Sequence, residues 1–173
     1  MKTTYNLAVS IDGYIAKPDG DISWLDELKV DHENTGHEAF YETVDALVMG
    51  FATYNFVHDY GSWPYGNKPT WVCTHSKLDV MDGCNLQEGS EPEFVHDCAN
   101  KSGIEHLWLV GGGVLATSFV NSGLLTHIGL SVMPIILGSG IKVFDVLPAH
   151  VLLQQTNSTA LSGLTHIEYS LDI

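Results

Sequence analysis

Three consecutive glycines in the middle of this chain suit the binding of an anion such as the pyrophosphate of a nucleotide. They follow Leu107–Val110, an apolar run typical of a buried strand, and precede a helix-prone segment that begins at Val114 and Leu115. The three are Gly111, Gly112 and Gly113. Without side chains they let a ligand approach the backbone, and the helix beyond offers free N–H groups and a positive dipole end. A tight strand-to-helix turn that binds nothing is the alternative.

A second strand–glycine–helix unit favours the anion-binding interpretation. The apolar run Leu47–Met49 leads to Gly50, and Thr53 then falls in the first turn of the next helix. A threonine there can cap the helix, and its hydroxyl can also contact a phosphate among the free N–H groups. Because ligands bind at the carboxyl ends of parallel strands, we expect both units to face one nucleotide cofactor.

The elements that must position these units alternate along the chain. The predicted strands are 7–11, 14–16, 46–49, 69–74, 106–110, 127–137, 151–156 and 164–171, and the predicted helices are 36–44, 50–57, 92–101 and 114–120. The polar segment 79–90 is predicted to be a loop. This order predicts an α/β fold with a mainly parallel mixed sheet, helices on both of its faces and an antiparallel C-terminal edge. Neither a repeat nor a linker interrupts the pattern, so we expect a single domain over 1–173.

Composition and charge exclude several classes of partner. The chain has seven Lys and Arg residues, all of them lysines, against 21 Asp and Glu, and its net charge is −14. Nucleic acids and acidic membrane surfaces require a basic face, so neither is an expected partner. We see no apolar run of membrane-spanning length and no signal peptide. Three cysteines without a C-x-x-C pair indicate free thiols, which favours a cytoplasmic location.

Several short motifs occur in a definite order along the chain. They are Ser10–Ala16, Pro18–Leu25, Val48–Gly50 with Thr53 and Tyr54, Thr74–Ser76, Val110–Gly113, and Pro134–Gly140 with Phe144. Each is weak alone, but their joint order and spacing resemble the dihydrofolate reductase superfamily. The branch that they resemble most closely contains the reductase domain of the bifunctional riboflavin-biosynthesis deaminase-reductase and its free-standing bacterial relatives.

The resemblance implies a three-layer α/β/α fold and hydride transfer from NADPH to a small heterocycle of the pterin or pyrimidine kind. It assigns the cofactor phosphates to the two glycine turns and the helix starts, which comprise Gly50, Thr53, Gly111, Gly112, Gly113, Val114 and Leu115. It assigns the adenosine 2′-phosphate to Thr74, His75 and Ser76. Relatives of this kind are commonly homodimers, and the apolar segment 128–137 needs a cover. Cover by the protein's own helices is the alternative.

This chain departs from the family where relatives often carry a positive charge. Phe51 and Ala52 follow the first helix glycine, His75 stands where arginine is common, and Val114 stands where some reductases have a basic residue. A neutral histidine holds a phosphate less firmly than the arginine fork does. NADPH is therefore favoured only modestly, and NADH is an alternative cofactor.

Two residues are candidates for catalysis on the substrate side. Asp12 lies in the Ser-x-Asp-Gly motif that the riboflavin branch has near its substrate, and Trp24 can form a wall of the nicotinamide pocket. The alternatives are that Asp12 only caps the Asp12–Gly13 turn and that Trp24 belongs to the core. The few lysines disfavour a substrate that carries a ribose phosphate.

The missing arginines leave a second hypothesis open, that of a nucleotide-binding module without reductase activity or a degenerate paralogue of the riboflavin-pathway reductase. Other chemistry has little support. The nine histidines show no H-E-x-x-H spacing, so no metal site is predicted, and no G-x-S-x-G elbow is present.

Overall fold

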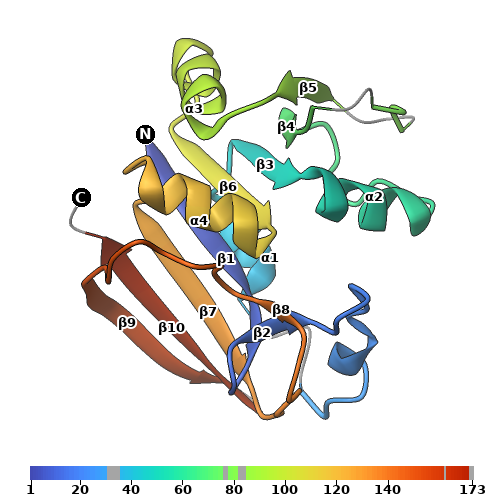
Figure 1. The fold of residues 1–173 in the computed structure, drawn as a ribbon, viewed down its shortest axis with the longest axis vertical. Coiled ribbons are helices and arrows are strands. Elements are labelled where there is room, and N and C mark those ends of the chain that lie inside the picture. Colours follow the sequence, from blue (N-terminus) through green and yellow to red (C-terminus); the bar gives the residue numbers. More distant parts are fainter. Residues whose placement is uncertain (31–35, 76–77, 82–84, 162, 172–173) are drawn as a thin grey trace.

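The computed structural model describes residues 1–30, 36–75, 78–81, 85–161 and 163–171 (Figure 1). Its strands are β1 (Lys2–Ser10), β2 (Tyr14–Ala16), β3 (Ala46–Gly50), β4 (Thr70–Cys73), β5 (Leu86–Gly89), β6 (His106–Gly111), β7 (His127–Met133), β8 (Ile141–Lys142), β9 (Leu153–Leu161) and β10 (Leu164–Leu171). Its helices are α1 (His37–Glu42), α2 (Phe51–Asp59), α3 (Pro92–Lys101) and α4 (Gly113–Asn121), with a short 3-10 helix at Ser23–Leu25.

Eight of these strands form one mixed sheet in the order β5-β4-β3-β6-β1-β7-β10-β9. The first six strands in this order, β5 to β7, run parallel to one another, whereas β10 is antiparallel to β7 and to β9. The predicted parallel sheet with an antiparallel C-terminal edge is therefore confirmed. The carboxyl ends of β3, β4 and β6, where the candidate binding residues lie, meet at one edge of the sheet.

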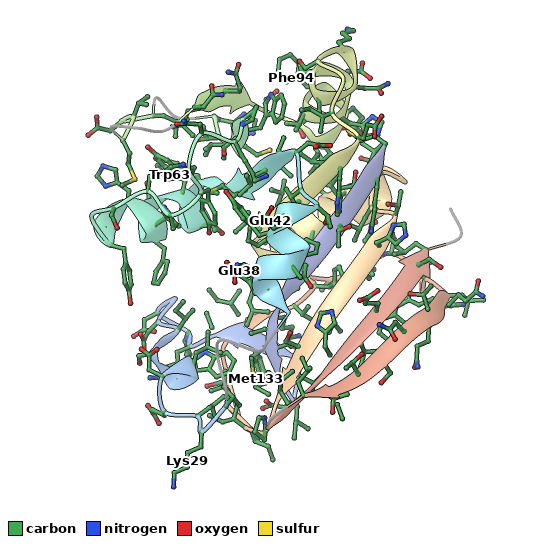
Figure 2. The ribbon with its side chains drawn as sticks, turned by 180° about the vertical axis from the view of Figure 1, so that it is seen from behind. Lys29, Glu38, Glu42, Trp63, Phe94 and Met133 are labelled. Atoms are coloured by element: carbon green, nitrogen blue, oxygen red, sulfur yellow. The ribbon has the colours of Figure 1, made fainter. Side chains whose placement is uncertain are left out.

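Helices cover both faces of the sheet, as predicted. On one face α3 and α4 bury Val95 and Phe119 against Tyr5 and Leu107, and Figure 1 shows α4 in front of β1 and β6. On the other face α1 packs Phe40 near a smaller cluster that includes Leu47 and Trp108. Figure 2, seen from behind, shows α1 over the same strands. The result is the three-layer α/β/α arrangement.

Several elements differ from the sequence prediction. β1 begins at Lys2 rather than Leu7, and β9 spans Leu153–Leu161 rather than 151–156. The segment expected to be a polar loop contains β5, which pairs with β4 as an edge strand; its four residues are too short for a clear alternation. The strand expected to run to Leu137 ends at Met133, because Pro134 has no N–H to donate to the ladder. The two-residue strand β8 pairs with β2 and has no pattern of its own.

The C-terminal part of the sheet is less covered than the rest. Every residue of β9 except the last is exposed, and in Figure 2 the strands β7, β10 and β9 have no helix in front of them. The uncovered strands form the floor of the main cavity of the molecule.

A helix long and apolar enough to cross a membrane is absent from the described part of the chain.

Candidate functional site

The two glycine turns of the sequence meet in the structure. β3 and β6 are parallel neighbours, and Met49 pairs with Gly111, so α2 and α4 begin at the same edge of the sheet. We call the residues at this junction the glycine cradle; they are Gly50, Thr53, Gly111 and Gly112. A Cβ atom built on Gly111 would lie 3.2 Å from the Thr53 hydroxyl oxygen, so the predicted residues are in contact.

The glycines in and beside the cradle are needed for different reasons. A Cβ on Gly113 would overlap the carbonyl oxygen of Lys142, so the packing of the chain itself requires glycine there. A Cβ on Gly112 would meet, among the described residues, just the Thr53 hydroxyl, at an ordinary 3.8 Å. Its φ and ψ angles are extended (−103° and −171°), and the peptide bond that precedes it is cis. The space beside Gly112 is therefore open, and a ligand can occupy it.

Among the described residues, neither helix has a side-chain cap at its start, so the N–H groups of both first turns face this space. α4 begins after Gly112 without a side-chain cap, and its first backbone bond runs from the Ala116 N–H to the Gly112 carbonyl (3.0 Å). The N–H groups of Val114 and Leu115 precede that bond and point out of the helix start. Val114 is 69% exposed and the Leu115 side chain packs on the core. Because both side chains are apolar, the polar groups that these two residues offer to a ligand are those of the backbone.

His75, which is predicted to contact the 2′-phosphate, lies just after β4 and has an acidic neighbour, Glu91. The His75 side chain is 82% exposed, and its Nε2 is 3.9 Å from the Oε1 atom of Glu91. The Thr74 N–H donates to the Gly89 carbonyl (3.0 Å), which fixes the strand end. Ser76 lies outside the described residues. A carboxylate beside His75 competes with a phosphate for the imidazole.

Asp12 has a structural role in this geometry. Its Oδ1 accepts hydrogen bonds from the Ser10 hydroxyl (2.7 Å) and the Leu137 N–H (3.1 Å), and its Oδ2 accepts one from the Gly138 N–H (2.7 Å). The Ser10 hydrogen bond, with help from the two N–H groups, lowers the pKa of Asp12 below its usual range. A carboxylate that stays ionised and has both oxygens occupied ties two loops together, and it is a poor proton donor.

Trp24 lies in the core, the alternative that the sequence allowed. It is buried in a cluster with Met133 and Leu164, and it is only 1% exposed. Among the described residues none accepts a hydrogen bond from its Nε1. Its neighbours Ile22 and Leu25, rather than Trp24 itself, line the cavity.

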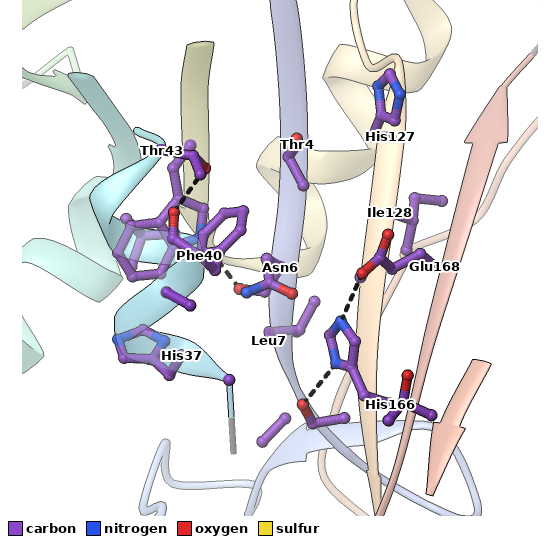
Figure 3. A pocket seen from close by; sticks show the side chains of 18 of the residues that line it. Thr4, Asn6, Leu7, His37, Phe40, Thr43, His127, Ile128, His166 and Glu168 are labelled. Carbon is purple, nitrogen blue, oxygen red and sulfur yellow. Dashed lines mark hydrogen bonds and ion pairs between the residues drawn. The ribbon is translucent and has the colours of Figure 1, made fainter. Parts of the chain in front are cut away.

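A cavity of about 960 Å³ opens on the uncovered face of the sheet (Figure 3). One end, at Ala8, Ile22, Leu25 and Val110, lies toward the carboxyl edge that carries the glycine cradle. The wall formed by α1 contributes Phe40, whose ring meets that of Trp108 edge-on at 5.5 Å. The volume is within the usual range for small-molecule sites.

Four polar side chains lie on the floor of this cavity among apolar ones, and the sequence did not reveal them as a group. We call the four floor side chains the polar floor; they are Asn6, Ser131, His166 and Glu168. These residues lie in two neighbouring rows that cross β1, β7 and β10. One row contains Ala8, Ser131 and His166, and the other contains Asn6, Gly129 and Glu168. Polar residues at every second position of three strands were the available signal, but the pairing of those strands was unknown.

The polar floor is held by its own contacts. The Ser131 hydroxyl is 3.0 Å from Nδ1 of His166, and Nε2 of His166 is 3.7 Å from Oε1 of Glu168. A dashed line in Figure 3 marks the pair of His166 and Glu168. Burial lowers the pKa of His166, and the nearby Glu168 carboxylate opposes that shift. A Cβ on Gly129 would overlap Oδ1 of Asn6 and lie 3.3 Å from Cε1 of His166. Glycine there leaves room for the floor side chains.

Other reactive groups are weak candidates. Burial raises the pKa of the Cys73 thiol to about 11, so it remains protonated and unreactive. Groups of three or more His, Cys, Asp or Glu able to hold a metal ion are absent from the described residues.

Comparisons with known proteins point to one family. A family model described as the RibD C-terminal domain matches residues 1–167. The uncharacterized protein YwjB of Bacillus subtilis is 32% identical over 171 residues, which cover 97% of each chain.

Solved structures agree with that match. The crystal structure of a protein from Shewanella sp. PV-4, provisionally described as a riboflavin biosynthesis protein, is 31% identical, with a TM-score of 0.86 and 100% of both chains covered. Dihydrofolate reductase from Enterococcus faecalis, complexed with NADP(H), has a TM-score of 0.70 at 17% identity and covers 99% of this chain and 97% of its own. The second likeness shows the shared fold.

Proposed function

Because the chain belongs to the RibD C-terminal domain family, we propose that it is a nicotinamide-nucleotide-dependent reductase that transfers hydride to a small heterocycle. The fold is of the reductase type, and the open space at Gly112 is the observation that carries the proposal. A Cβ at that position would meet no close contact among the described residues, whereas it would occupy the space proposed for a bound pyrophosphate.

The glycine cradle suits the pyrophosphate of such a cofactor. The N–H groups at the starts of α2 and α4 and the Thr53 hydroxyl would hold the phosphate oxygens without any arginine. When bound, the nicotinamide supplies the hydride. Ala8, Ile22, Leu25 and Val110, at the adjoining end of the cavity, are all apolar and would exclude water from the reacting atoms.

We propose that the preference for NADPH over NADH is small. His75 lies just after β4, where the resemblance places the 2′-phosphate, and its Nε2 is 3.9 Å from Oε1 of Glu91. A nearby carboxylate offsets part of any attraction to the phosphate. Both cofactors would therefore bind with similar affinity.

A second candidate function is a nucleotide-binding module without reductase activity. The carboxylate beside His75 and the full hydrogen bonding of Asp12 favour it, because they remove two groups that a reductase of this family was expected to use. Such a module would bind the nucleotide in the glycine cradle, but the bound NADPH would not be oxidised when a heterocycle is added.

We also propose that the protein is a homodimer in the cytoplasm. In the apolar segment that led us to expect a dimer, Ile128 is only 3% exposed and belongs to the core cluster, whereas Leu130 and Val132 are half-buried. The supporting surface is instead the exposed edge strand β9 with the apolar residues before it, Val151 and Leu152.

Two titrations test the reductase against the binding module. NADPH and NADH are titrated against the protein while the emission of the reduced nicotinamide is followed. Pterins and pyrimidines are then added, and the loss of reduced nicotinamide absorbance is measured. Binding followed by oxidation supports the reductase, binding without oxidation supports the module, and no binding of either nucleotide contradicts both.

A further inference from the structure

We propose that the polar floor binds the N–H edge of an uncharged or cationic nitrogen heterocycle, and that the ligand of this cavity carries no phosphate. The inference rests on the proposed function in placing the substrate in this cavity. It adds the chemical class of the ligand and the side chains that recognise it.

Glu168 is the central residue of this proposal. Among the described residues that line the cavity it is the one carboxylate, and its side chain is 49% exposed. A carboxylate accepts two parallel N–H bonds from a ring N–H and a neighbouring amino group, and such charge-assisted pairs are strong. The 2-aminopyrimidine edge of pterins has this arrangement.

His166 and Ser131 orient the carboxylate and complete the hydrogen-bonding pattern. The lowered pKa of His166 means a neutral imidazole near pH 7, with one donor and one acceptor nitrogen. With the Ser131 hydroxyl donating to Nδ1, the Nε2–H faces Glu168, in agreement with the 3.0 and 3.7 Å separations. Asn6 flanks Gly129 on the side opposite Glu168 in the sheet register and adds an amide to the floor.

The same side chains do not form a nucleophilic centre. Ser131, His166 and Glu168 follow the order of a nucleophile, a base and an acid. Stabilisation of an oxyanion needs N–H groups that are free to point at it. Ser131 lies on β7 between β1 and β10, where the sheet uses the backbone N–H groups, so the array suits ligand binding.

The charges of the cavity disfavour a phosphate. Lys2 is the one lysine among its described lining residues, and it lies four residues of extended strand from Asn6, about 13 Å away. A phosphate close to the floor would instead meet the negative charge of Glu168. Arginine, which usually holds a ribose phosphate, does not occur in the chain.

The test is a comparison of neopterin with neopterin 3′-phosphate, which differ only in the phosphate. Binding of each is measured by pterin fluorescence and calorimetry, without a nicotinamide nucleotide. We expect neopterin to bind at least about tenfold more tightly than its phosphate. Glu168→Gln, which keeps the shape and removes the charge, should weaken neopterin binding by about tenfold or more, and Ser131→Ala by less.

The matched control is Glu93→Gln. Glu93 is also a carboxylate that faces a serine, since the Ser122 hydroxyl donates to it at 2.5 Å, but it lies on α3 away from the cavity. This variant should bind neopterin like the wild type. Unchanged thermal midpoints would show that all variants are folded.

Three results would overturn the proposal: equal or tighter binding of the phosphate, wild-type affinity in Glu168→Gln, or no binding of either pterin. An NADPH titration of the same proteins separates this test from that of the reductase. If neopterin binding follows Glu168 but no nicotinamide nucleotide binds, the reductase proposal fails and the ligand assignment stands. If NADPH binds and Glu168→Gln has no effect on neopterin, only the ligand assignment fails.

Discussion

His106 is a buried imidazole whose two nitrogens are both used in the folded protein. Nε2 is 2.8 Å from the Thr4 hydroxyl oxygen, and Nδ1 is 2.9 Å from the Thr43 carbonyl oxygen, to which it must donate. A neutral ring therefore bonds as donor at Nδ1 and as acceptor at Nε2. Burial lowers the pKa of His106, with Lys2 adding to that shift.

The stability that His106 contributes should decrease in acid. Its pKa is lower in the folded than in the unfolded chain, so below about pH 6.5 the unfolded state binds its proton first and is favoured. We expect His106→Gln to lose about 1 to 2 kcal/mol of the free energy of unfolding at pH 7.5. The difference from the wild type should narrow toward pH 5 in urea titrations. A difference that is constant or widens in acid would contradict this assignment.

Glu91 should limit the preference for NADPH. Its carboxylate lies 3.9 Å from the His75 imidazole, near the expected position of the 2′-phosphate. We expect Glu91→Gln to raise the ratio of NADH to NADPH dissociation constants by about threefold, a modest effect because both side chains are exposed. His75→Ala in the same background should remove the gain. A ratio that Glu91→Gln leaves unchanged would place the adenosine end elsewhere.

At the scale of elements, Asp12 joins the β1–β2 turn to the segment after β7. Its two oxygens accept N–H groups of Leu137 and Gly138, more than a hundred residues away in sequence. We expect Asp12→Ala to lower the thermal midpoint by roughly 3 °C or more, while NADPH binding is retained within about twofold. Scanning calorimetry and nucleotide titration measure the two effects. An unchanged midpoint combined with lost turnover would instead make Asp12 catalytic.

The elements were largely predictable because their signals are local. The helix 92–101 agrees with α3 at both ends, since Pro92 suits a first helical position and Gly103 follows the last turn. The edge strand β5 and the short β8 were missed, because both depend on a partner strand rather than on their own pattern.

The site divides in the same way. The glycine cradle was predictable, since each half is a continuous motif and parallel neighbours bring the halves together. The polar floor was not, because Asn6, Ser131 and Glu168 become neighbours only through the register of β1, β7 and β10. The three glycines also looked equivalent in sequence, whereas the packing of the chain requires Gly113 and leaves open space beside Gly112.

For the whole molecule, the exposed edge at β9 predicts association. Leu152 is 79% exposed next to a nine-residue edge strand without lysine or proline. Light scattering after size exclusion should give about twice the 18.9 kDa mass of one chain, and Leu152→Asp should shift the protein toward the single-chain mass. A wild-type mass near 18.9 kDa at micromolar concentration would rule out the dimer.

Gly112→Val tests whether the glycine cradle holds a nicotinamide nucleotide. The φ and ψ angles at Gly112 are extended, and a Cβ there would meet one described contact, at 3.8 Å, so we expect the variant to fold. The new methyl groups would occupy the space proposed for the pyrophosphate.

The control is Ser118→Val, which introduces the same branched side chain further along α4. We expect NADPH affinity to fall at least about a hundredfold in Gly112→Val and to stay unchanged in Ser118→Val, with wild-type circular dichroism in both. Wild-type NADPH binding by folded Gly112→Val would show that the pyrophosphate does not lie in the glycine cradle.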